Sequence, residues 1–275
     1  MLLKYSRALL VVQMESRVLK FIELAEYLYR NGWVHFKLSD GGWTERLEGE
    51  ERIFGIVIRT LLCNDTSSEK FFVDIGGLEG TKAVYNKDVD FVHWLSIKLD
   101  HYKMGSGKGS HRDGRHKKWT PKGIKEYLEL TEFKQRDYLD NVRGYNVLFN
   151  DLDSVYSVGP LTSFDITKRF YEAGVIEFLP DRFYLTGSGE AKGLRALFPS
   201  LKNDGELVKK GDFLIKTIIE RTGISEEVAH FGVEDLLCIY QKDKRYEKFL
   251  KGKLSAQDYG SVLLDKNCTW ERGVC

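Results

Sequence analysis

Apolar residues recur at helical spacing along most of the chain. Near the N-terminus they follow an i, i+3, i+4, i+7 pattern that stops at Gly32, which predicts an amphipathic helix. Residues 53–63 (IFGIVIRTLLC) are apolar on nearly every side, and the length of this run favours a buried central helix over a strand. Residues 212–221 and 233–241 also have helical periodicity. The hydrophobic pattern therefore predicts an all-α, mainly helical fold. The N-terminal apolar positions are Val18, Phe21, Ile22, Ala25, Leu28 and Tyr29.

Proline and glycine mark the expected ends of two further helices. Thr120 and Pro121 have the order of an N-cap and a first-turn proline, which predicts a helix from there to about Leu130. Pro160 and Gly174 similarly bound a predicted helix, and we expect its apolar face to contain Leu161, Phe164 and Tyr171.

Residues 72–90 contain three glycines, Gly76, Gly77 and Gly80, and predict a loop or a short irregular element.

The composition is that of a globular protein with a sizeable core. The chain has 275 residues, of which 42% are hydrophobic and 30% charged. Arg7 interrupts the N-terminal apolar patch and no small-residue cleavage site follows it, so this segment is not typical of a signal peptide. No apolar run approaches the roughly 18 residues of a membrane span. We expect a cytoplasmic protein with no membrane association and no obligate protein partner.

The cysteine and histidine residues do not have the spacing of a metal site. Cys63 and Cys238 lie in apolar runs and predict buried free thiols, whereas Cys268 and Cys275 predict a reduced C-terminal tail. No Cys-x-x-Cys occurs, and the histidines His111 and His116 have no acidic or cysteine residues at the spacing of metal ligands. The sequence predicts no metal and no cofactor.

Positive charge is concentrated in residues 102–125, although the net charge of the chain is only +1. This segment carries eight basic residues against one acidic residue, a net charge of +7. A local basic stripe in a nearly neutral protein predicts a polyanionic partner, and the simpler alternative is a solvated surface loop. Its GSGKGS run lacks the spacing of a P-loop. The residues expected to bind DNA here are Arg112, Arg115, Lys117 and Lys118, and Trp119 is a candidate for base stacking.

Residues 157–163 carry the most informative motif. Ser157-Val158-Gly159 predicts a tight turn before the helix at Pro160, and backbone amides at such a helix start can hold a DNA phosphate. The segment resembles the helix-hairpin-helix of DNA glycosylases, which has the pattern Gly-Val/Ile-Gly-x-x-Thr-Ala. Ser157 replaces the first glycine of that pattern, and the matching residues are Val158, Gly159, Thr162 and Ser163. The resemblance implies that Val158, Gly159 and Thr162 contact DNA.

The same resemblance implies a catalytic aspartate about two dozen residues after the start of the turn, and Asp181 lies there. Asp181 as an N-cap or loop carboxylate is the simpler alternative. Asp165 is a second acid nearby, but its place in the middle of a helix favours solvation. Members that cleave the DNA strand carry a lysine where this chain has Leu161, which implies a monofunctional enzyme.

A second stretch, residues 61–67 (LLCNDTS), resembles the Leu-Leu-Ser-Gln-x-Thr-Ser of the same family. There a buried helix ends in a polar residue that enters the duplex where the flipped base has left. The resemblance implies this role for Asn64, with Asp65 beside it. Capping of a helix by Asn64 and Asp65 remains an equal alternative.

Residues 159–198 also resemble the alpha-glutamyl/putrescinyl thymine pyrophosphorylase family through a Gly-x-Gly-x-x-x-Gly-Leu element after the acid. Some bacterial members of that family resemble antiphage glycosylases that excise glucosylated hydroxymethylcytosine. Residues Gly187, Ser188 and Gly189 then become candidates for a base-pocket or phosphate contact, and a plain turn is the alternative. The element is completed by Gly193 and Leu194.

These observations predict a two-lobed helix-hairpin-helix fold, with residues 1–52 and 199–275 forming a terminal helical lobe. Residues 53–198 would form the hairpin lobe, including the basic loop 102–125. The expected function is monofunctional removal of a hypermodified pyrimidine from double-stranded phage DNA by base flipping. Two alternatives stay open. One is an amino acid or polyamine transferase that acts on pyrophosphorylated 5-hydroxymethyluracil in DNA, and the other is a non-catalytic DNA-binding module.

Overall fold

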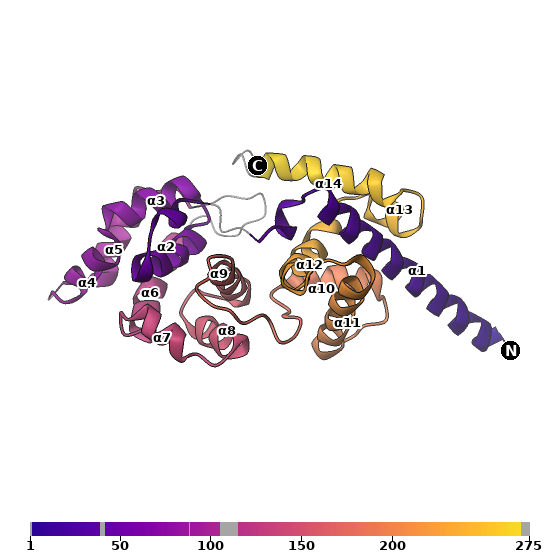
Figure 1. Ribbon diagram of the computed structural model, residues 1–275, viewed down its shortest axis with the longest axis horizontal. Coiled ribbons are helices and arrows are strands. Elements are labelled where there is room, and N and C mark those ends of the chain that lie inside the picture. Colours follow the sequence, from indigo (N-terminus) through magenta and orange to yellow (C-terminus); the bar gives the residue numbers. More distant parts are fainter. Residues whose placement is uncertain (1, 39–41, 88, 105–114, 271–275) are drawn as a thin grey trace. The chain divides into compact units, whose positions relative to one another are not determined.

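The computed structural model describes residues 2–38, 42–87, 89–104 and 115–270 (Figure 1). Every regular element in these ranges is helical, with fourteen α-helices and two short 3-10 helices, η1 and η2. The prediction of an all-α fold is therefore confirmed. Among the described residues no helix has the length and apolar character needed to cross a membrane.

The chain divides into two compact units. The terminal unit comprises residues 1–38 and 180–274, and the central unit comprises residues 39–179. The unit boundaries thus fall after residues 38 and 179, whereas the sequence predicted them after residues 52 and 198. The segment after residue 180 belongs with the C-terminal helices because α10 (Ser188–Leu197) packs along α12 (Glu226–Tyr240) within the terminal unit.

Helix α1 (Leu2–Arg30) contributes one wall of the terminal unit's core and ends before Gly32, as its periodicity predicts. Phe21, Leu24 and Leu28 of this helix are fully buried. Helix α14 (Ala256–Trp270) lies along α1 (Figure 1). The remaining helices of the unit are η1 (Val34–Phe36), α11 (Asp204–Thr222) and α13 (Tyr246–Leu250).

Two glycines allow α10 to approach α12 closely. A Cβ atom at Gly189 would overlap the Cys238 side chain, and one at Gly193 would overlap the backbone carbonyl of Leu237. The two glycines are four residues apart and therefore lie on one face of α10. Close packing of α10 on α12 therefore explains why two positions of the Gly-x-Gly-x-x-x-Gly-Leu element, Gly189 and Gly193, are glycines.

The central unit is built around α2 (Gly49–Leu62), whose residues from Ile53 to Leu62 are all buried. The predicted central buried helix is confirmed. The helices packed against it are η2 (Trp43–Arg46), α3 (Asp65–Asp74), α4 (Gly77–Tyr85), α7 (Gln135–Asn141) and α9 (Pro160–Glu172). The unit also contains α5 (Phe91–Asp100), α6 (Arg115–Leu130) and α8 (Tyr145–Ser154), of which α5 and α6 pack together and α8 packs on α9.

The predicted loop at residues 72–90 is wrong, because α3 extends to Asp74 and α4 occupies residues 77–85. The glycines form the tight junction between these two helices. Gly76 and Gly77 have φ angles of 75° and 61°, and a Cβ atom at Gly80 would press on the Ile75 carbonyl. The Glu51 carboxylate accepts hydrogen bonds from the amides of Leu78 and Glu79 and so caps α4.

The predicted start of α6 is also wrong, because the helix begins at Arg115 and Pro121 lies inside it. Proline lacks the N–H that would bond to the carbonyl four residues earlier. Packing of α6 against α5 outweighs this loss, and Thr120 is buried.

The expectation of a buried Cys63 and the expectation that Leu161 lies on the apolar face of its helix are both wrong. In each case the residue lies at the end of an apolar run, where it reaches the surface. Cys63, at the C-terminal end of α2, is exposed. Leu161 is 40% exposed, whereas Phe164 in the same helix is buried.

We predict that Gly193→Ala lowers the free energy of unfolding by about 1–3 kcal/mol, because the new methyl group overlaps the α12 backbone. Gly205→Ala is the matched control in helix α11, where the new Cβ atom has only an ordinary contact at 3.5 Å. Alanine should stabilise the control variant by up to about 1 kcal/mol through helix propensity. Urea unfolding followed by circular dichroism measures both changes, and a stabilised Gly193→Ala variant would contradict the close packing.

Candidate nucleic-acid interface and active site

Helices α8 and α9 pack against each other and are joined by a tight turn at residues 155–159. Ser157 has a left-handed φ of 64°, a conformation that favours glycine, which accounts physically for the glycine at this position of the helix-hairpin-helix pattern. Val158 donates its amide to the Val155 carbonyl at 3.0 Å, and both valine side chains are buried. Gly159 caps α9 in an extended conformation with open space around its Cα atom.

The side chains of Val158 and Thr162 are buried, so they support the turn and do not form its outer surface. Pro160 begins α9 and Gly174, with φ of 66°, follows its end, as predicted. The groups that the turn presents to a ligand are therefore the backbone around Gly159 and the exposed side chain of Leu161.

Helix α6 is fixed to this turn by several contacts. The amide of Tyr156 donates to the Glu126 carboxylate at 2.7 Å, and the Ser157 hydroxyl donates to the Trp119 carbonyl at 3.4 Å. A Cβ atom at Gly123 would come within 2.5 Å of the Tyr156 carbonyl oxygen, which is closer than packed atoms allow. Helix α6, which carries the described C-terminal part of the basic segment, and the hairpin turn are separate features in the sequence, but these contacts join them into one surface of the central unit.

Lysine side chains lie on this surface. Lys122 places its ammonium 3.9 Å from the centre of the half-exposed Tyr156 ring, and Lys118 is exposed one turn earlier on α6. Lys117 is half-buried and donates to the Asp100 carbonyl at 3.1 Å, so part of its function is structural. The predicted DNA contact Arg112 and the side chain of Arg115 lie outside the described residues.

Asn64 and Asp65 both stabilise the junction of α2 with α3. Asn64 is the N-cap of α3 and accepts a hydrogen bond from the Ser67 amide at 2.9 Å. Asp65 forms a bidentate ion pair with Arg59, at 2.7 Å and 3.1 Å. Arg59 is 6% exposed and needs a counterion, because a buried unpaired charge is strongly destabilising. The structure thus gives both residues a structural role, and entry into a duplex stays a prediction.

Asp181 lies in the terminal unit at the rim of a cavity of about 460 Å³, which we call the Asp181 cavity. Its carboxylate is exposed and accepts a hydrogen bond from the Tyr184 hydroxyl at 2.7 Å. Burial, together with this hydrogen bond, raises the pKa of Tyr184, so the phenol stays protonated and can donate. The cavity is lined by Asp181, Arg182, Asp212, Ile215, Lys216, Ile219, Glu220, Glu226 and His230.

The segment that carries Asp181 is held to α11 by packing and by a hydrogen bond. The amide of Phe183 donates to Asp212 at 2.5 Å, and a Cβ atom at Gly211 would overlap the buried Phe183 ring. Asp212 is thereby engaged with the backbone, whereas Asp181 remains open to the cavity.

His230 is an ionisable side chain of the Asp181 cavity that is largely buried, with 12% of its side chain exposed. Its Nε2 atom lies 3.7 Å from Glu226, and its buried Nδ1 atom has no hydrogen-bond partner among the residues that the structure describes. Burial lowers the pKa of His230, and the charges of Glu226, Asp212 and Asp181 oppose that shift. At neutral pH the cavity therefore contains a neutral imidazole. Sequence reasoning missed this residue because it is a lone histidine in a helical segment.

Gly187, Ser188 and Gly189 form the start of α10, where Gly187 is the N-cap. Gly189 faces Cys238 of α12, so its small size is used for helix packing. Gly187 and Ser188 are exposed, and a ligand contact at these two residues stays a prediction.

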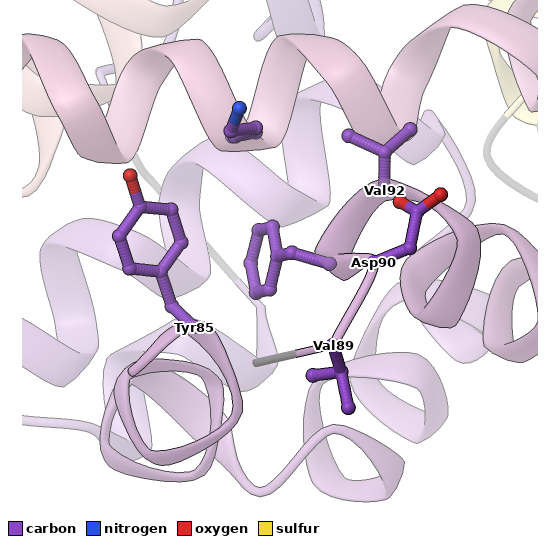
Figure 2. A pocket seen from close by; sticks show the side chains of 6 residues that line it. Tyr85, Val89, Asp90 and Val92 are labelled. Carbon is purple, nitrogen blue, oxygen red and sulfur yellow. The ribbon is translucent and has the colours of Figure 1, made fainter. Parts of the chain in front are cut away.

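A second cavity, of about 370 Å³, lies in the central unit between α4, α5 and α6 (Figure 2). The Tyr85 and Phe91 rings meet edge to face with centroids 5.2 Å apart, and the Tyr85 hydroxyl donates to Glu129 at 2.7 Å. Asp90 caps α5 by accepting from the His93 amide at 3.0 Å. The polar groups of this cavity are thus engaged in holding three helices together.

No group of three or more His, Cys, Asp or Glu side chains with metal-binding geometry occurs in the described part of the chain. Comparison of the chain with protein-family models, with curated proteins and with solved structures gave no match. The family resemblance therefore rests on the motif residues alone.

We predict that His230 titrates with a pKa below 6.5, the ordinary value for histidine, because the folded protein disfavours its charged form. Glu226→Gln should lower this pKa further, since the variant removes a charge that favours the imidazolium. Glu220→Gln, in the same cavity, is the control and should shift the pKa less. The measurement is an NMR titration of the imidazole protons, and a midpoint above that of free histidine would contradict the burial argument.

Proposed function

We propose that this protein is a monofunctional DNA glycosylase that binds double-stranded DNA and hydrolyses the N-glycosidic bond of a hypermodified pyrimidine. In this proposal the central unit supplies a helix-hairpin-helix for the phosphate backbone, and Asp181 supplies the catalytic carboxylate. The motif resemblance suggests phage DNA, with glucosylated hydroxymethylcytosine as the first base to test.

The observation that carries the proposal is the joint surface of the hairpin turn and α6. The left-handed Ser157 and the extended Gly159 give the turn the backbone form that a glycine-rich hairpin requires. Amides at the start of α9 can hold a phosphate without reading base sequence. The neighbouring helix α6 adds positive charge through the exposed Lys118 and through Lys122, which also pairs with Glu126 at 3.6 Å. Contacts of this kind position a protein on DNA, which supports binding to duplexes of any sequence.

Asp181 has the properties that hydrolysis of a flipped nucleotide requires. Its carboxylate is accessible from a cavity large enough for a small ligand, and Tyr184 orients it. Water attacks C1′ as the bond to the base nitrogen breaks, and the leaving base takes the bonding electrons and then a proton. The negative charge of Asp181 stabilises the oxocarbenium-like transition state, and the carboxylate accepts the proton that the water loses.

The charge of the Asp181 cavity bears on the transferase alternative. Four carboxylates, those of Asp181, Asp212, Glu220 and Glu226, face two permanent cations, Arg182 and Lys216. A pyrophosphate leaving group carries several negative charges and is repelled by an excess of carboxylates. A glycosylase could keep the DNA phosphates outside the cavity, whereas the transferase would have to hold pyrophosphate inside it, so the charge of the lining argues against the transferase.

We predict that the double variant Lys118→Glu/Lys122→Glu weakens binding to any duplex and flattens its salt dependence. Each lost phosphate contact should reduce the slope of log affinity against log salt by about 0.9. Lys253→Glu, on an exposed turn of the terminal unit, is the control and should behave like the unaltered protein. Fluorescence anisotropy with a labelled duplex at several salt concentrations measures both quantities. An unchanged slope in the double variant would remove α6 from the interface.

We predict that Asp181→Asn abolishes base release while leaving duplex affinity within about twofold, because the carboxylate acts on the reacting atoms. Glu177→Gln, an exposed acid shortly before Asp181 in the chain, is the control and should retain full release. The substrates are DNAs of known phage modification, and alkali-labile abasic sites are the readout. Normal release by Asp181→Asn would exclude its catalytic role, and a borohydride-trapped protein adduct would contradict hydrolysis by water.

A further inference from the structure

Two carboxylates of the terminal unit are buried in its core and do not line the Asp181 cavity, although one of them lies one turn after His230 on α12. Glu190 in the first turn of α10 and Glu234 in the middle of α12 are each 2% exposed. The Thr186 hydroxyl lies between them, 2.5 Å from Glu234 Oε1 and 3.1 Å from Glu190 Oε1. The second oxygen of Glu190, Oε2, is buried and has no hydrogen-bond partner among the described residues.

The number of protons limits how these three side chains can be bonded. A threonine hydroxyl carries a single hydrogen, so it donates to one carboxylate and can only accept from the other. The second contact therefore needs a hydrogen that belongs to a carboxyl group. Two ionised carboxylates at this depth would also repel each other in a medium of low dielectric.

We propose that Glu190 and Glu234 together retain one proton at neutral pH, and that this proton locks the segment carrying Asp181 onto α12. Thr186 ends that segment, and its hydroxyl connects the segment to both acids. When the proton leaves, the three-way hydrogen bonding fails and charge repulsion separates α10 from α12 at this point.

The surroundings agree with retention of the proton. Burial, followed by the charge of Asp235 and the proximity of Glu190, raises the pKa of Glu234 well above the ordinary value. Asp235 itself is paired with His35 of η1 at 3.0 Å, and Cys238 lies on the next turn of α12, where Lys242 is close to it. From α11, Asp212 is engaged by the Phe183 amide. Lys242 and His35 therefore lie against Cys238 and Asp235, and the described contacts give neither of them a bond to the buried pair.

The sign of the pH effect is set by the raised pKa. The stabilising contribution is complete below the pKa of an unfolded glutamate and is lost as pH rises toward the raised pKa of Glu234 in the folded protein. The terminal unit should thus be more stable at mildly acidic than at alkaline pH, apart from the opposite effect of His230 below about pH 6.5.

The first test compares Glu234→Gln with the unaltered protein by thermal unfolding at about pH 5 and about pH 8.5. Glutamine keeps an oxygen for Thr186 and cannot ionise. We expect the variant to gain about 3 °C or more in Tm at the alkaline pH and little at the acidic pH. Glu177→Gln is the exposed control and should show the pH dependence of the unaltered protein. An equal loss of Tm at both pH values in Glu234→Gln would overturn the proposal.

The second test follows the lock itself, and its main readout uses the unaltered protein. Trypsin cleavage after the exposed Arg182 reports release of the segment, and cleavage after Lys253 in an exposed turn corrects for the pH dependence of the protease. The ratio of the two rates should rise at least threefold from about pH 6.5 to about pH 8.5 in the unaltered protein, and it should stay flat in Glu234→Gln. A flat ratio in the unaltered protein would overturn the lock. Neither test depends on the chemistry of Asp181.

Discussion

The central unit depends on two acidic side chains of α2 that accept hydrogen bonds from the unpaired backbone amides at the starts of neighbouring helices. Every helix begins with backbone amides that have no partner within the helix. Glu50 accepts the amides of Gln135 and Arg136 at the start of α7, at 2.7 Å and 2.8 Å, while the adjacent Glu51 accepts two amides at the start of α4. Two consecutive acids on one buried helix thus orient two others. The hairpin and α6 are assembled on this frame, since α2 also packs against α9.

The terminal unit reaches its compactness through close contact of α10 with α12. The glycines that permit this contact lie on either side of Glu190 in the sequence, and the approach of the two backbones places Glu190 beside Glu234. The buried pair Glu190 and Glu234 is therefore a direct result of the close packing of the glycine-containing face of α10 against α12. The same contact fixes the end of the segment on which Asp181 and Tyr184 lie.

Helix periodicity made much of the fold predictable from the sequence. It placed the helix ending at Gly32, the buried helix at residues 53–62, and the helix between Pro160 and Gly174. It did not place α4, because glycines there mark a sharp junction between helices and local composition resembles that of a loop. The start of α6 was missed because tertiary packing tolerates Pro121 within the helix.

The candidate site was predictable only where a motif existed. Ser157 and Asp181 were candidates because of the motif resemblance, whereas His230 and the acid pair depend on burial between helices. Tyr184 contacts Asp181 only three residues away, but no motif marks it. Asn64 and Asp65 also belong to a stretch that resembles a family motif, but the structure gives them structural roles. Asn64 caps a helix and Asp65 pairs with Arg59. A motif indicates which residues occur together, and burial and hydrogen bonding decide what each of them does.

The order of the units along the chain has a consequence for synthesis. The central unit is one continuous stretch, residues 39–179, whereas the terminal unit is assembled from both sides of it. Domains generally fold as they leave the ribosome, so the central unit can form its core before α11 and α12, the packing partners of α1's unit, have been synthesised. During that interval the apolar face of α1, with Phe21, Leu24 and Leu28, is uncovered. The nascent chain therefore passes through a stage at which a folded insert is preceded by an exposed apolar helix.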